Sequence, residues 1–101
     1  MLKISINETK DQTVLRVEGK LIAPWTEELE NAWQHLAKTL GDQALCLDIR
    51  STTFVDQNGL RILGKIIRVA NADVLADSPL TRQFAEQARQ IEQNHDERKQ
   101  L

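Results

Sequence analysis

The sequence predicts an α/β domain in which a mixed four-stranded sheet packs with three helices. Its N-terminal part alternates apolar and polar residues with the period of a β-strand. Further along, segments with apolar residues at helical spacing follow short, almost wholly apolar runs. A chain of 101 residues, 41% of them hydrophobic, can build one core but not two. We therefore expect a single domain over residues 1–92 and a polar tail over residues 93–101 that is frayed or disordered.

The first two strands are expected to form an antiparallel hairpin. Apolar residues occupy every second position from Leu2 to Ile6, and a polar, turn-like segment covers residues 7–12. The alternation then resumes in residues 15–21. This pattern predicts a leading hairpin with one face against the core and one face in contact with water.

Three helices are predicted from apolar spacing and from signals at their ends. The first is expected to open at Ala23-Pro24, because proline is tolerated in the first helical turn, and to end at Gly41. The second runs from about residue 58 to residue 69. Ser78-Pro79, a hydroxyl cap followed by proline, is expected to start the third.

The two remaining strands are the short segments at residues 44–49 and 72–77, which gives the order β-β-α-β-α-β-α. The βαβα units imply parallel strand pairs with right-handed crossovers. In such sheets, ligands and partners usually bind at the edge where strands end and helices begin. Residues 51–59 lie on that edge, so we expect the functional site there.

Composition and charge argue against several classes of function. A net charge of −2 gives no electrostatic basis for binding nucleic acid or an anionic membrane surface. No apolar segment has the length of a signal peptide core or a membrane span, so we expect a cytoplasmic protein without membrane insertion. Cys46 is the only cysteine, which leaves no internal disulfide and no cysteine metal cluster. Because no catalytic triad, glycine-rich phosphate loop or metal-ligand spacing can be assembled, we expect no enzyme, no cofactor and no metal site.

The segment from Asp56 to Gly59 contains the residues best suited to recognition. Asp56 fits the N-cap position, where its carboxylate would accept hydrogen bonds from backbone N–H groups of the helix that follows. Gln57, Asn58 and Gly59 would then be the first helical residues, whose N–H groups have no partner within the helix. The alternative is purely structural, with Asp56 as an ordinary cap and Gly59 allowing close packing.

The wider pattern resembles the STAS domain, a family named for sulphate transporters and anti-sigma-factor antagonists. The family's segment of strand, Phe-hydrophobic-Asp and Gly-Leu is similar to residues 47–49, 54–56 and 59–60. VLRVEGKL (residues 14–21) looks like the family's second strand, and VLADSPLTRQF (residues 74–84) looks like its fourth strand and the start of the next helix. Each motif alone is loose, but their order and spacing together are fairly specific. The resemblance extends over most of the chain and implies a STAS-like sheet.

The sequence departs from the family at the residue that regulated members phosphorylate. That position, directly after Asp56, is Gln57 here, and an amide cannot accept a phosphoryl group. The resemblance therefore implies that the usual phosphorylation switch is absent. Ser51, Thr52 and Thr53 are the hydroxyl residues nearby, and they are weak alternative sites.

The second predicted helix offers a contact surface next to this segment. Arg61 and Lys65 form a basic stripe, while Ile62 and Ile66 widen the apolar arc beyond what one buried face requires. We expect these four residues to join Asp56–Gly59 in binding a protein partner. The alternative is that the third helix covers the additional apolar residues.

The resemblance implies a binding module in bacterial transcription regulation. Anti-sigma-factor antagonists of this family bind a serine kinase that is also an anti-sigma factor, in a partner-switching system of signal transduction. The unphosphorylated antagonist is the form that binds, and Gln57 is similar to that uncharged form, so we expect constitutive binding. Two alternatives remain, an accessory subunit of an ABC-type membrane transport complex and a homodimer with an architectural role only.

Overall fold

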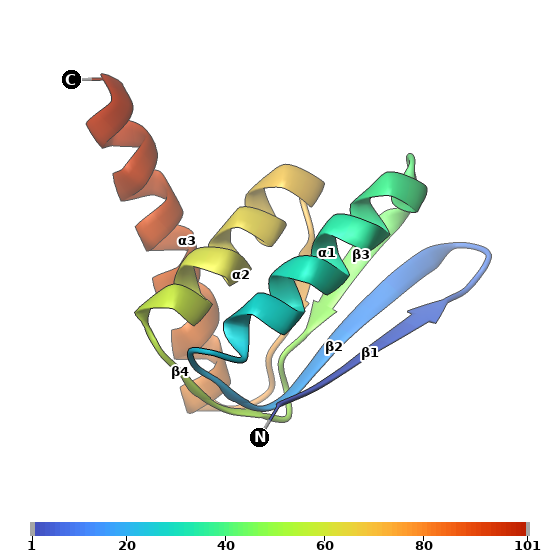
Figure 1. The fold of residues 1–101 in the computed structure, drawn as a ribbon, viewed down its shortest axis with the longest axis horizontal. Helices are drawn as coiled ribbons and strands as arrows, with labels where there is room; N and C mark the ends of the chain where they lie inside the picture. The colour runs from blue at the N-terminus through green and yellow to red at the C-terminus, as the bar shows by residue number, and fades with distance from the viewer. Residues whose placement is uncertain (1, 101) are drawn as a thin grey trace.

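Eight elements follow one another within residues 2–100, the part of the chain that the computed structural model describes (Figure 1). They are β1 (Leu2–Glu8), β2 (Gln12–Leu21), α1 (Thr26–Leu40), β3 (Ala44–Asp48), β4 (Thr52–Val55), α2 (Gln57–Ala70), β5 (Asp73–Leu75) and α3 (Pro79–Gln100). Side chains are described as far as Ile91. The prediction of a frayed tail over residues 93–101 concerns residues whose side chains are not described, and it stays a prediction.

The sheet is mixed, and the structure assigns five strands to it rather than the predicted four. β1 and β2 pair antiparallel, with Leu2 opposite Gly19 and Glu8 opposite Thr13, so the predicted hairpin is confirmed. β3 pairs in parallel with the first half of β2, and β5 pairs in parallel with β3. The parallel crossovers expected from the sequence are therefore present.

β4 is the strand that the sequence pattern did not predict. It lies within the expected loop at residues 51–59 and pairs in parallel with the end of β2, from Gly19 to Leu21. β2 has ten residues and β3 only five, so the second half of β2 would lack this partner without β4. A strand of four residues is too short to show a clear alternation, so the sequence pattern alone does not predict it.

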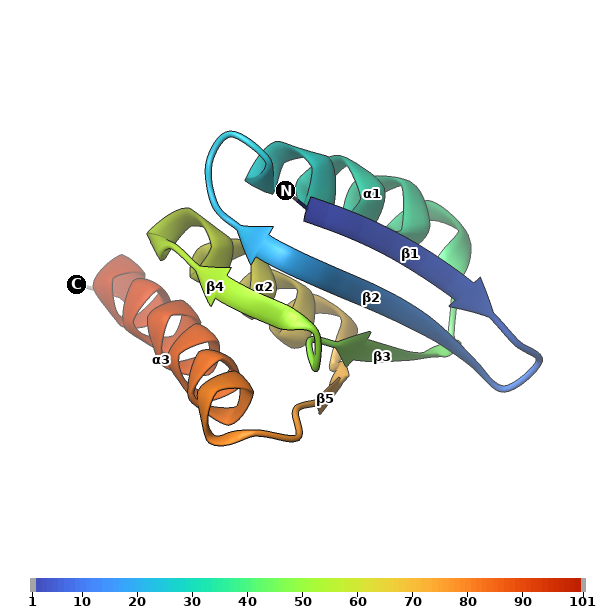
Figure 2. The same cartoon turned by 90° about the horizontal axis from the view of Figure 1, so that it is seen from below.

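The helices are placed unequally around the sheet. α1 and α2 lie side by side over one face, and α3 runs beside β4 and packs against α2 (Figures 1 and 2). Within residues 2–100, no helix lies over the opposite face of β1, β2 and β3 (Figure 2). The core lies between the sheet and the helices, and its most deeply buried side chains include Leu15, Val17, Leu21, Leu29, Leu47, Ile49, Leu63 and Ile66.

α1 begins later than predicted. Residues 23–25 form a turn, in which the N–H of Glu27 donates to the carbonyl of Pro24 over 3.3 Å, and the helix begins at Thr26. The predicted start at Ala23-Pro24 is therefore wrong, and Pro24 belongs to the turn that leads into the helix. The predicted end is confirmed, because Gly41 adopts a φ of 58°, a backbone conformation that favours glycine.

α3 begins where its sequence signal predicted. The hydroxyl of Ser78 accepts a hydrogen bond from the N–H of Thr81 over 3.1 Å, and Pro79 is the first helical residue. The Thr81 hydroxyl in turn accepts the N–H of Asp77 over 3.2 Å. This cap sets the direction in which α3 leaves β5 and returns along β4.

Gly59, in the first turn of α2, approaches the sheet more closely than any other residue type would allow. A Cβ atom at this position would lie 2.6 Å from the carbonyl oxygen of Leu21 and 2.7 Å from Cγ1 of Val55. The first of these atoms is backbone within a paired strand, so it cannot turn away as a side chain would. The glycine therefore fixes the distance between α2 and the ends of β2 and β4.

We predict that Gly59→Ala destabilises the fold. Alanine favours a helix over glycine by about 1 kcal/mol, but overpacking costs typically about 1–3 kcal/mol, and contact with fixed backbone belongs at the upper end of that range. The expected net loss is about 1–2 kcal/mol in the free energy of unfolding, measured by urea denaturation. Gln57→Ala, an exposed change in the same turn, is the control and should stay within about 0.5 kcal/mol of the wild type. Equal stability of Gly59→Ala and the wild type would contradict this packing.

Candidate binding site at the start of α2

The carboxylate of Asp56 joins two segments that are far apart in the sequence. Oδ1 accepts the N–H of Gly59 over 2.8 Å, which is the predicted N-cap bond of α2. Oδ2 accepts the N–H of Ala23 over 2.9 Å, from the turn that precedes α1. The N–H of Asp56 itself donates to the carbonyl of Leu21 over 3.1 Å. The predicted cap is confirmed, and it also holds the entrance of α1 against the entrance of α2.

The two amides that follow Asp56 are open to solvent. Gln57 and Asn58 are both exposed, and so are Ala23 and Pro24 in the turn beside them. Trp25, at the end of that turn, has 38% of its surface exposed. The entrance of α2 is thus accessible to another molecule, as a recognition role requires.

A groove runs between the N-terminal ends of α1 and α2, and Asn58 is one of the residues that line it. It has a volume of about 390 Å³ and is lined by Ala23, Pro24, Thr26, Glu27, Glu30, Asn58, Arg61 and Ile62. Its acidic side chains come from α1 and its basic side chain comes from α2. Lys65 lies one turn further along α2, where its Nζ is 4.0 Å from Oε1 of Glu30.

Two residues predicted to contact a partner are buried instead. Gly59, in the first turn of α2, is buried against the sheet, and Ile66 has no exposed surface. Ile66 follows Gly59 and Leu63 at helical spacing, on the side of α2 that packs against the sheet, and it therefore belongs to the core. The prediction that Ile66 lies on the surface is therefore wrong. Ile62 is half-buried and lines the groove, while Arg61 and Lys65 are exposed as predicted.

The nearby hydroxyl residues differ in accessibility. Thr52 is buried, and its hydroxyl donates to the carbonyl of Val17 over 2.8 Å, which removes it as an alternative phosphorylation site. Ser51 is half-buried, and Nη2 of Arg16 donates to its hydroxyl over 3.4 Å. Thr53 is exposed. Neither residue lies at the entrance of α2, so neither takes the place of Gln57.

A second polar cluster lies on the uncovered face of the sheet. The carboxylate of Asp48, which is 3% exposed, accepts two parallel hydrogen bonds from the guanidinium of Arg50, each 3.0 Å long. The backbone N–H of Arg50 adds a third hydrogen bond over 3.1 Å. These bonds lower the pKa of Asp48 below its usual value, and the hydrogen bonds from the Arg50 side chain have the largest effect.

This cluster was missed in the sequence, although a signal was present. Asp48 and Arg50 are separated by one residue, so opposite charges follow each other on the same face at the end of a strand. Arg16, one strand away, pairs with Glu18 over 3.1 Å and lies in the same hollow of about 400 Å³. The charged side chains of this face therefore form ion pairs mostly with one another.

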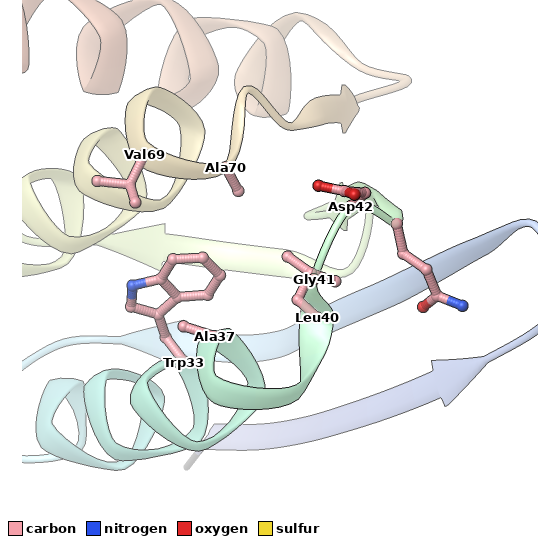
Figure 3. A pocket seen from close by; sticks show the side chains of 8 residues that line it. Trp33, Ala37, Leu40, Gly41, Asp42, Val69 and Ala70 are labelled. Atoms are coloured by element: carbon pink, nitrogen blue, oxygen red, sulfur yellow. The ribbon is translucent and has the colours of Figure 1, made fainter.

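A further hollow lies between the C-terminal ends of α1 and α2. Figure 3 shows Trp33 and Ala37 of α1 facing Val69 and Ala70 of α2, with Gly41 and Asp42 closing one end. Its volume is about 340 Å³. Trp33 is almost fully buried, whereas 60% of Val69 is exposed. The hollow contains no cluster of titratable or nucleophilic side chains.

The described residues offer little to a metal ion or a thiol chemistry. Within the part of the chain that the structure describes, no three His, Cys, Asp or Glu side chains come together in a way that could hold a metal. Cys46 is buried, and burial raises the pKa of its thiol. Over the same described residues, no helix is long and apolar enough to cross a membrane. A comparison with models of known protein families finds none that matches the chain.

From the Asp48–Arg50 ion pair we predict how the stability of the fold changes in acid. Folding lowers the pKa of Asp48. The contribution of this carboxylate to the free energy of unfolding is therefore fully present above the unfolded pKa of about 3.9, and it is lost as the pH falls through the folded pKa. Asp48→Asn should therefore be less stable than the wild type at neutral pH, and the difference should shrink in acid. Urea denaturation at a series of pH values measures this difference. Asp11→Asn, in the exposed hairpin turn, is the control, and an Asp48→Asn deficit that does not change with pH would contradict the assignment.

Proposed function

We propose that the chain is a STAS-like protein-binding module of the anti-sigma-factor antagonist kind that binds its partner without a phosphorylation switch. The observation that carries the proposal is the exposed entrance of α2, where Asp56 fixes the helix start and Gln57 and Asn58 are open to solvent. The partner surface consists of these three residues together with Arg61, Ile62 and Lys65. Gly59 supports it from beneath.

The identity of the residue after Asp56 supports binding that is always available. A phosphoryl group at this position would add about two negative charges and three strong acceptor oxygens at a helix N-terminus. Gln57 can gain neither, and its side chain is exposed rather than engaged within the fold. The module therefore keeps the uncharged form of the site at all times.

The arrangement of the elements is consistent with the family resemblance. An antiparallel hairpin leads into parallel strands, and the segment Phe54–Asp56 passes directly into α2. The quoted motifs fall on the elements expected for them, since residues 14–21 lie in β2 and residues 47–48 lie in β3. No specific feature of the described residues favours the transport-complex alternative, so that alternative is left to the experiment.

We predict that Gln57→Glu weakens partner binding. The substitution keeps the size of the side chain and adds the negative charge that phosphorylation would bring, so we expect a Kd at least about tenfold higher, or about 1.4 kcal/mol. The wild type is used to capture a partner from native lysate, and the affinity of the purified pair is then measured by calorimetry. Gln12→Glu makes the same chemical change at the other end of β2 and is the control.

The outcome separates the candidate functions. A kinase-like partner that loses affinity for Gln57→Glu but not for Gln12→Glu supports the proposal. A partner that binds both variants as tightly as the wild type overturns it. Capture of a transporter ATPase or permease would identify the accessory-subunit alternative, and recovery of the chain alone would favour an architectural homodimer.

A further inference from the structure

The groove between α1 and α2 has walls of opposite charge. Glu27 and Glu30 stand on the α1 side, and Arg61 stands on the α2 side, with Lys65 one turn further on. The half-buried Ile62 and the exposed Pro24 also line the groove and make part of it apolar. The charges are thus separated across the groove rather than mixed along it.

Only the far end of the groove is neutralised within the chain. Lys65 and Glu30 approach to 4.0 Å there. At the end nearer to Asn58, Glu27 and Arg61 form no ion pair with any described residue. An uncompensated acid and an uncompensated base therefore face the same space from opposite helices.

The uncovered face of the sheet differs in this respect. There, Arg16 pairs with Glu18, and Arg50 pairs with Asp48, so opposite charges satisfy one another within the chain. A solvated sheet face needs no partner to explain such pairs. In the groove, by contrast, two exposed opposite charges, Glu27 and Arg61, occur together with the half-buried Ile62 and the exposed amide of Asn58.

We propose that the groove binds a segment of a protein partner that places a basic side chain against Glu27 and an acidic side chain against Arg61, on either side of a small apolar contact with Ile62. The inference rests on the proposed function, because the partner is taken to be a protein, and it adds the chemistry by which that partner is recognised. Charge complementarity of this kind selects the correct partner and orients it more than it adds affinity. Asp56 keeps the two walls in register because it joins the entrances of both helices.

The test uses three synthetic helical peptides that share an apolar row and differ in the two flanking rows. One peptide carries Lys on one flank and Glu on the other, the second carries Lys on both, and the third carries Glu on both. Binding of each fluorescently labelled peptide is measured by anisotropy at low and at high salt. The wild type should bind the split peptide about three- to fivefold more tightly than the other two, the size expected for one partly exposed ion pair, and high salt should reduce the difference.

Two charge reversals should change the preference in opposite directions. At the end of the groove nearer to Asn58, Glu27→Lys makes both walls basic and should shift the preference to the Glu-only peptide. Arg61→Glu makes both walls acidic there and should shift the preference to the Lys-only peptide. Glu86→Lys and Arg89→Glu, on the exposed side of α3, change the net charge by the same amounts and are the controls. Circular dichroism confirms that each variant is folded.

The proposal is overturned if the α3 variants shift the preference as far as the groove variants do, because net charge alone would then explain the result. It is also overturned if the wild type does not distinguish the split peptide from the others. A captured partner that responds to Gln57→Glu but not to Glu27→Lys or Arg61→Glu would refute the groove and remove Arg61 from the partner surface, while leaving the proposed binding at Gln57 intact. The reverse pattern, with peptide selectivity but no captured partner, would refute the proposed function alone.

Discussion

The two oxygens of the Asp56 carboxylate hold the entrances of α1 and α2 together. One oxygen accepts the Gly59 N–H at the start of α2, and the other accepts the Ala23 N–H in the turn before α1. An ordinary N-cap satisfies only the helix that follows it. Because this cap also binds a turn 33 residues away, the entrances of α1 and α2 are fixed relative to each other, and so is the groove between them.

Close packing beneath the cap strengthens the same constraint. β4 pairs with the last residues of β2. Because residue 59 is a glycine, α2 can pack closely against Leu21 and Val55, where these two strands end. Asp56 is therefore held by its own backbone bond to Leu21 as well as by its side chain. A recognition site gains affinity when its groups are already ordered before binding, because less conformational entropy is then lost. The exposed amides of Gln57 and Asn58 belong to a helix start that is ordered in this way.

Local signals in the sequence predicted much of the fold. The alternation in the first 21 residues, the Asp56 cap and the Ser78-Pro79 start of α3 are each determined by neighbouring residues, and each is confirmed. β4 was not predicted, because its existence depends on the unpaired half of β2 and not on its own four residues. Ile66 was placed on the surface because helical spacing shows an apolar arc but not which neighbour covers it. The bond from Ala23 to Asp56 involves a backbone N–H, which leaves no mark on residue type.

The role of Asp56 can be measured at single residues by comparing hydrogen exchange of the Ala23 and Gly59 amides in the wild type and in Asp56→Ser. Serine has one side-chain oxygen, which can cap α2 but cannot also reach the turn before α1. The account predicts that Gly59 keeps most of its protection, while the Ala23 amide exchanges about tenfold faster, as expected for the loss of one hydrogen bond of about 1.4 kcal/mol. Unchanged protection of Ala23 in Asp56→Ser would contradict the claim that this carboxylate joins the two helix entrances.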